Sequence, residues 1–316
     1  MIISASRRSD IPCYYSEWIL NRLEEGSVLI PNPRNAGRLS RVALSPENVD
    51  CIVFWTKNPA PMLETLSRIE ELGYKYYFEF TITAYGKEME SHLPEKQTVV
   101  DTFRRLADRL GPVAVDWRFD PILRTDSAMK NGNFSAEWIA ERFSELCRQL
   151  HDHTERCIIS FVDEYSHTRN RNAMLSEGEM RETAGLIAEI AAQYRLPVFS
   201  CAEEIDLGGL GIGHAACIDG QKIERLIGVP METKKDAGQR PACGCIESID
   251  IGAYDTCGNG CAYCYAVTSP GTLSRRMREH DPLSPLLTGW PKGTELITDR
   301  AAPSLQIDQI SIFESF

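Results

Sequence analysis

Three cysteines in the last quarter of the chain have the type and the spacing for metal chemistry. They are arranged as Cys257-x3-Cys261-x2-Cys264. Thiolates are the usual ligands of iron–sulfur clusters, so three on one tight loop can each hold one iron of a four-iron cubane. The fourth iron then stays open to a substrate or cofactor, and the cluster supplies chemistry that no side chain can. Gly258 and Gly260 allow the loop to curl so that the thiols converge.

Four further cysteines can form a second metal site. Cys243 and Cys245 are a tight pair in a Gly/Pro-rich segment where they have no evident packing role. We therefore expect them to be ligands of an auxiliary [4Fe–4S] cluster or of zinc. Cys201 ends the last predicted strand and Cys217 lies in a glycine-rich segment. For these two, a ligand role and a role as a small buried hydrophobic residue both stay open.

The first cysteine array resembles the signature of radical S-adenosylmethionine (radical SAM) enzymes, and its local wording Gly-Cys-Ala-Tyr-Cys-Tyr-Ala is most similar to the spore photoproduct lyase branch. Over nearly its whole length the chain is similar to a bacterial family known as domain of unknown function 1848. This family has a C-terminal cysteine cluster like the N-terminal one of radical SAM proteins. The similarity is carried by the cysteine loop and by four stretches, Ile3–Asp10, Phe54–Pro59, Trp117–Pro121 and Ser248–Gly252.

The resemblance implies a function for the loop. Cys257, Cys261 and Cys264 would hold a [4Fe–4S] cluster whose open iron binds S-adenosylmethionine, with Tyr263 in the same cofactor-binding loop. An electron from a donor such as flavodoxin or ferredoxin would cleave the cofactor and release a 5′-deoxyadenosyl radical. The lyase-like wording suggests DNA repair, whereas the acidic composition suits a small molecule or a protein side chain equally well as substrate.

Two other functions compete with this enzyme. Zinc is an alternative metal for the array, with Cys243 or Cys245 as the fourth ligand, and the chain would then be a zinc-stabilised binding protein. An iron–sulfur protein that senses redox state without turning over S-adenosylmethionine is a third interpretation. Cys261→Ala separates these functions, because loss of activity with a retained fold favours the enzyme.

Composition limits the class of protein. The 316 residues are 43% apolar, enough for a large core, and contain no run of about twenty apolar residues that would cross a membrane. The start has no signal-peptide pattern, so we expect a cytoplasmic protein whose eleven cysteines serve metal or redox chemistry rather than disulfides. The net charge of −11 argues against extensive nucleic-acid binding, which needs a basic face.

The pattern of elements predicts an α/β fold. Strand-like segments near 2–6, 51–56, 75–83, 113–118, 157–162 and 197–201 alternate with amphipathic segments near 15–25, 60–72, 94–110, 135–153 and 176–194. Such repetition indicates a parallel sheet. The resemblance implies a partial (βα)6 TIM-like barrel over residues 1–201. The Gly/Pro-rich composition after residue 202 indicates a cysteine-rich, cluster-binding extension over 202–316 that packs on the barrel mouth. Because the cysteine loop follows the last strand instead of the first, either the barrel is circularly permuted or the extension carries the loop back to the mouth.

Charged residues follow almost every predicted strand. Since the carboxyl ends of parallel strands form the active-site edge in such folds, we expect these side chains to meet there. A site for a zwitterionic amino acid, a sulfonium and a ribose needs both signs of charge, and arginine can pair bidentately with a carboxylate. The candidate catalytic residues are Arg7, Arg8, Asp10, Lys57, Glu79, Arg118, Asp120 and Glu203.

Overall fold

Eight strands form one sheet in which every neighbouring pair is parallel. The computed structural model describes residues 1–33, 35–124, 134–165, 168 and 174–307. The strands lie in the order β10 (Ile249–Asp250), β1 (Ile2–Ala5), β4 (Cys51–Thr56), β5 (Tyr76–Thr81), β6 (Val115–Ile122), β7 (Cys157–Phe161), β8 (Val198–Ser200) and β9 (Gly213–His214). The six predicted strands are the central six of this order.

Both faces of the sheet are buried because its strands are apolar at successive positions. One face packs against the helices through large side chains such as Phe54, Phe78 and Trp117. The alternate residues point to the other face, where they meet the C-terminal third of the chain in a second cluster that includes Val53, Tyr77, Ile158, Ile218 and Ile246. The segment after residue 202 therefore packs directly on the sheet.

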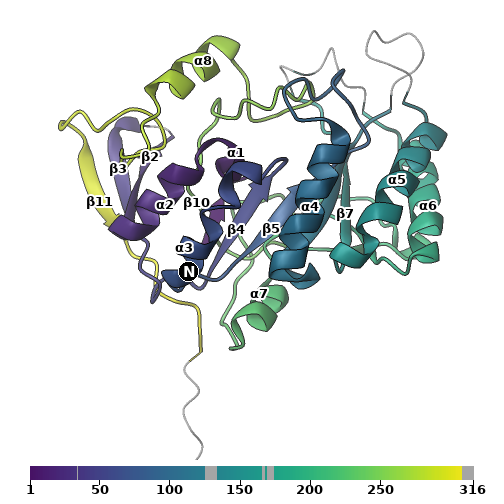
Figure 1. The fold of residues 1–316 in the computed structure, drawn as a ribbon, viewed down its shortest axis with the longest axis horizontal. Coiled ribbons are helices and arrows are strands. Elements are labelled where there is room, and N and C mark those ends of the chain that lie inside the picture. The colour runs from purple at the N-terminus through teal and green to yellow at the C-terminus, as the bar shows by residue number, and fades with distance from the viewer. Residues whose placement is uncertain (34, 125–133, 166–167, 169–173, 308–316) are drawn as a thin grey trace, which may run out of the picture.

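Helices follow the strands as the amphipathic pattern predicts (Figure 1). A glycine in the left-handed region, Gly26, ends α2, and Ser176 forms a capping box with Glu179 at the start of α6. The helices are α1 (Ile11–Tyr14), α2 (Ser16–Glu25), α3 (Leu66–Glu71), α4 (Lys96–Leu110), α5 (Ala136–Leu150), α6 (Glu177–Gln193), α7 (Gly220–Ile227) and α8 (Pro270–Glu279). Short 3-10 turns cover Ala60–Met62, Pro112–Ala114, His151–His153 and Gly208–Leu210.

A second, three-stranded sheet lies beside α2 and α8 (Figure 1). β2 (Ser27–Asn32) and β3 (Asn35–Ala43) form an antiparallel pair, and β11 (Leu296–Arg300) adds to β3 in parallel. The sequence did not predict this sheet. It joins the segment after α2 to the end of the described chain.

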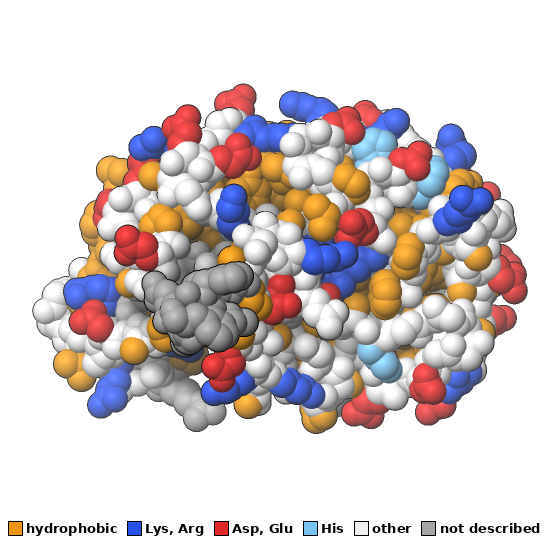
Figure 2. Space-filling view, turned by 90° about the horizontal axis from the view of Figure 1, so that it is seen from below, with side chains coloured by type: hydrophobic (Ala, Val, Ile, Leu, Met, Phe, Trp, Pro, Cys, Tyr) orange, Lys and Arg blue, Asp and Glu red, His pale blue; other side chains and the backbone are white. Residues whose placement is uncertain are grey.

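The α/β class and the parallel sheet are confirmed. The partial (βα)6 barrel stays a prediction: β10 and β9 are the edge strands of the sheet, and within the described ranges no ladder joins them. None of the helices in these ranges is both long and apolar enough to span a membrane. On the face shown in Figure 2, basic and acidic side chains are interspersed over the described surface.

Candidate functional site

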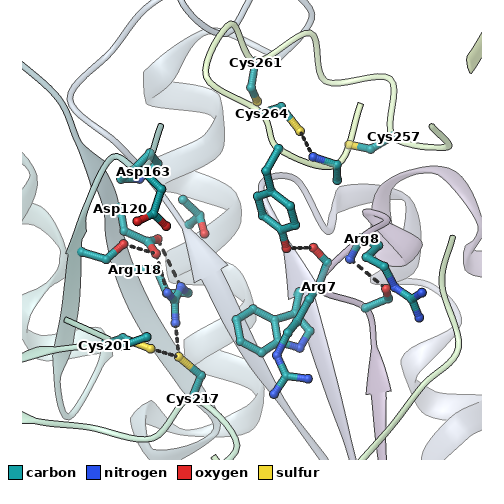
Figure 3. Close-up of a pocket in the computed structure, with 18 of the residues that line it drawn as sticks. Arg7, Arg8, Arg118, Asp120, Asp163, Cys201, Cys217, Cys257, Cys261 and Cys264 are labelled. Carbon is teal, nitrogen blue, oxygen red and sulfur yellow. Dashed lines mark hydrogen bonds and ion pairs between the residues drawn. The ribbon is translucent and has the colours of Figure 1, made fainter. Parts of the chain in front are cut away.

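A cavity of about 640 Å³ opens at the carboxyl ends of the parallel strands. It brings together nearly all residues that the sequence singled out (Figure 3). Those lining it are Arg7, Arg8, Asp10, Lys57, Arg118, Asp120, Cys201, Cys217, Cys243, Cys245, Cys257, Cys261, Tyr263 and Cys264. Residues that are up to 257 positions apart in the chain thus line one cavity, and whether it is a functional site stays a prediction.

Glu79 and Glu203 are the two candidates that do not line the cavity. Glu79 is fully buried in β5, where its carboxylate accepts from Arg118 Nη1 at 3.0 Å. Glu203 accepts from the backbone N–H of Phe161 at 2.8 Å. In this structure both side chains support neighbouring elements, and their contact with a ligand stays a prediction.

Asp10 connects three segments of the site by hydrogen bonds. Its carboxylate accepts from Thr56 Oγ1 at 2.7 Å, from the backbone N–H of Lys57 at 2.8 Å and from Asn259 Nδ2 at 2.9 Å. Asp10 is buried, and burial raises the pKa of this carboxyl in spite of these donors. The turn after β1, the end of β4 and the cysteine loop thus share one anchor.

Glu90 is a second anchor, which the sequence did not suggest. It accepts from Lys57 Nζ at 2.8 Å, from Lys96 Nζ at 3.3 Å and from the Tyr263 hydroxyl, and its backbone forms a β-bridge with Cys261. Burial alone would raise its pKa, but the two ammonium groups lower the pKa of Glu90 to about 2. Glu90 therefore ties the cysteine loop to the loop after β5 and holds Lys57 in a buried ion pair.

Asp250, at the end of β10, holds the arginine-rich turn after β1. Its carboxylate accepts from Ser6 Oγ at 2.7 Å, from the backbone N–H of Arg7 at 2.9 Å and from Arg8 Nη2 at 2.8 Å. Burial opposes the charge on Asp250, but Arg8 and these donors lower its pKa. The Arg8 side chain is consequently paired with Asp250. Arg7 hydrogen-bonds with Asp250 through its backbone N–H, and its side chain extends to the cavity floor.

The cavity floor is cationic and aromatic. The guanidinium carbons of Arg7 and Arg118 lie 5.2 Å and 5.1 Å from the centroid of the Trp55 ring, distances at which a cation is attracted to an indole face. Arg7 Nη2 and Trp55 Nε1 are buried, and neither has a hydrogen-bond partner within the described part of the chain. Two buried donors at a cavity wall are costly unless a ligand accepts from them.

The predicted cluster loop lies along the upper edge of the cavity in Figure 3. Cys257, Cys261 and Cys264 are half-buried, and burial raises the pKa of each thiol, that of Cys261 to about 12. Gly260 has φ +71°, and a side chain there would overlap Ser91. Over the described ranges, no group of three or more His, Cys, Asp or Glu side chains is arranged to hold a metal ion.

The other four predicted ligands meet on the opposite edge of the cavity. The sulfurs of Cys201 and Cys217 are 2.9 Å apart, and the Cys245 thiol interacts with those of Cys217 and Cys243. All four residues are buried. The two cysteines that the sequence left open, Cys201 and Cys217, thus adjoin the pair that it favoured.

Sequence reasoning missed several residues that line the cavity or hold its walls in place. Asp250 follows a strand-like segment, so the strand-end rule applied to residues 248–252 could have found it. Glu90 gives no such signal, because its partners are brought to it only by the fold. Tyr254, Asn259 and Tyr265 also line the cavity, and the Tyr265 hydroxyl donates to the carbonyl of Arg7.

Comparisons with known proteins assign this architecture to a family. A solved structure that resembles the chain is a Bacteroides thetaiotaomicron protein provisionally named an α-L-fucosidase. The two share 12% identity and a TM-score of 0.29 over 75% of this chain and 83% of that one, a likeness too small to carry an argument. No curated protein matches the chain. The family model described as "Domain of unknown function (DUF1848)" matches residues 2–266, and the chain therefore belongs to this family.

Proposed function

We propose that this protein is a radical SAM-like iron–sulfur enzyme. Cys257, Cys261 and Cys264 would hold a [4Fe–4S] cluster that leaves one iron open, and the cavity beneath the loop would hold S-adenosylmethionine and a substrate. Once bound, the cluster would supply one-electron reduction of the sulfonium, with the electron coming from a donor such as flavodoxin or ferredoxin.

The observation that carries the proposal is the position of β10 in the sheet. In radical SAM enzymes the cysteine loop follows the first strand of the barrel. Here the loop follows β10, which is late in the chain but pairs in parallel with β1 at the sheet edge. In spatial order the cysteine loop thus follows the first strand, as a circularly permuted partial barrel requires.

The donor chemistry of the loop fits a cluster. Each thiolate of a cubane binds a different iron, so its ligands stand farther apart than the ligands of one ion. Three thiols that share a cavity edge without closing on one point are compatible with that spacing. Their raised pKa values mean that they would release protons as the metal binds.

The rest of the cavity suits a zwitterionic ligand. Its volume of about 640 Å³ lies within the usual range of small-molecule sites, roughly 300–1,000 Å³. Arg7 Nη2 is a buried donor that has no partner among the described residues, while Asp120 and Asp163 line the cavity at the ends of β6 and β7. In the proposed enzyme, Arg7 would bind a carboxylate and the aspartates would accept from an amine or from hydroxyl groups.

Anaerobic reconstitution tests the proposal. The protein would be loaded with iron and sulfide, reduced, and studied by electron paramagnetic resonance with and without S-adenosylmethionine. We expect about four irons per chain at the loop and a reduced-cluster signal that changes when the cofactor is added. A protein that binds only zinc, or a cluster whose signal is indifferent to S-adenosylmethionine, would overturn the proposal.

A further inference from the structure

The four buried cysteines form a compact group of sulfur atoms. Besides the contacts already described, Cys201 interacts electrostatically with both Cys243 and Cys245. The four thiols therefore influence one another, although the residues come from the end of β8, from the segment after β9 and from a turn ahead of β10. Convergence of four thiols from three separate segments needs an explanation beyond apolar packing.

Donors lie against two of these sulfurs. Arg118 Nη1 donates to Cys217 Sγ, the backbone N–H of Ile218 points to Cys245 Sγ at 3.4 Å, and the guanidinium of Arg7 interacts electrostatically with Cys245. Arg118 also pairs with Glu79 and Asp120, so part of its charge is already balanced. Donors and cations stabilise a thiolate rather than a neutral thiol.

A buried cysteine elsewhere in the sheet shows the contrast. Cys51 Sγ lies 3.7 Å from the carbonyl oxygen of Ile52, which makes the thiol a donor rather than an acceptor. Cys147 and Cys157 lie in the main hydrophobic core. These three behave as small hydrophobic residues, which is the ordinary state of a buried cysteine.

The spacing of the sulfurs selects the type of metal centre. Four sulfurs bound to one zinc ion at about 2.3 Å in tetrahedral geometry stand about 3.8 Å apart. The 2.9 Å between Cys201 and Cys217 is nearer to this value than to the wider spacing of cubane ligands. As they stand, the thiols do not surround one point. An ion would draw them into place by side-chain rotation and by opening the closest pair by roughly 1 Å.

We propose that Cys201, Cys217, Cys243 and Cys245 bind one zinc ion in a closed, four-thiolate site. Binding would exchange four thiol protons for the ion, leaving a complex of net charge −2 beside the guanidinium groups of Arg7 and Arg118. The site would fasten the turn that carries Cys243 and Cys245 to the end of β8. It would be structural, because four protein ligands leave no position open.

Metal analysis on a chain without the other cysteine array tests this site separately from the proposed cluster. The variant C257A/C261A/C264A would be purified and its zinc measured by mass spectrometry. We expect about one zinc per chain, and a near-complete loss when C243S/C245S is added. C147A removes a buried core cysteine and is the matched control, which should keep the ion. Absence of zinc, zinc that survives C243S/C245S, or four irons in place of zinc would overturn the proposal.

A measurement on the unaltered full-length chain removes the risk that the serine variants fail to fold. Native protein would be treated with a thiol-alkylating reagent before and after a zinc chelator, and the labelled cysteines identified by peptide mass spectrometry. Joint labelling of all four residues only after chelation supports the site. A Cys201–Cys217 disulfide in the protein as purified under reducing conditions, or labelling that ignores the chelator, contradicts it.

Discussion

The two cysteine groups differ in the number of thiols, in burial and in their neighbours. The loop of Cys257, Cys261 and Cys264 contributes three half-buried thiols on one short segment, fixed at its margins by Asp10 and Glu90. The opposite group joins four buried thiols from three segments and has cations against its sulfurs. Three ligands leave a metal centre open to a substrate, whereas four close it. One cavity thus carries an arrangement suited to reaction beside one suited to stability.

Removing a cysteine from each group should affect different properties, and the largest effect should be on activity. Cys261→Ala should abolish reductive cleavage of S-adenosylmethionine and lower bound iron while the protein stays folded, because two thiolates cannot retain the cubane. Product analysis by chromatography and a thermal melt measure both properties. Cys147→Ala is the control. Cleavage at the wild-type rate by Cys261→Ala would remove the distinction between the groups.

The double variant C243S/C245S should act mainly on stability. Loss of a structural zinc should lower the free energy of unfolding by about 3 kcal/mol or more, since metal binding to such sites is coupled to folding. Chemical denaturation with and without chelator measures this change. A variant as stable as the wild-type protein, and equally insensitive to chelator, would show that the four thiols are only core packing.

Acid should weaken the anchor of the three-cysteine loop. Because the pKa of Glu90 is lowered to about 2 from a usual value of 4.5, its ionised form stabilises the fold above pH 4.5. That contribution should fade as the pH falls from about 4.5 toward 2, and integrated over the window it is on the order of 2–3 kcal/mol.

Glu90→Gln should flatten this part of the stability profile while retaining a partner for Tyr263. Unfolding free energies at several pH values for both proteins give the difference curve. If the difference in unfolding free energy between the two proteins did not change from pH 4.5 to about pH 2, Lys57 and Lys96 would not be holding Glu90 ionised.

The sequence predicted the part of the fold that depends on local patterns. Apolar runs such as residues 51–56 form the central strands, and the charged residues that follow them surround one cavity. The second sheet was missed because β11 is exposed along its whole length and pairs with β3 about 260 residues earlier. Its stability comes from a long-range pairing that no local pattern records.

For the candidate site as well, the sequence predicted the residues that follow a local pattern and missed those that only the fold brings together. Array spacing singled out Cys257, Cys261 and Cys264, the strand ends singled out Arg7 and Arg118, and all five line the cavity. The sequence could only suggest that the four buried cysteines converge, since their meeting depends on how the segment after residue 202 crosses the sheet. Glu90 was out of reach because its contact with Tyr263 spans 173 residues.

Glycine-to-alanine substitutions compare how strongly the stability of the protein depends on the backbone of each cysteine segment, and their expected effects are the smallest. Gly260 has φ +71°, and a methyl group there would strike Ser91, whereas a methyl group on Gly244 would meet Ala216 Cβ at an ordinary 3.6 Å. Gly260→Ala should therefore cost about 2 kcal/mol, of which about 1 is backbone strain. Gly244→Ala should change stability by less than about 0.5 kcal/mol.

Gly26→Ala separates strain from collision, because Gly26 has φ +70° with no atom within 4 Å of the added methyl group. The loss of unfolding free energy in Gly26→Ala, measured by the same denaturation experiment, should equal only the part of the Gly260→Ala loss that comes from backbone strain. Gly260→Ala should also weaken iron retention, since the collision displaces the turn between Cys257 and Cys261. If all three variants were equally stable and held iron equally well, the backbone conformation at Gly260 would not be needed to place the thiols of the loop at the cavity.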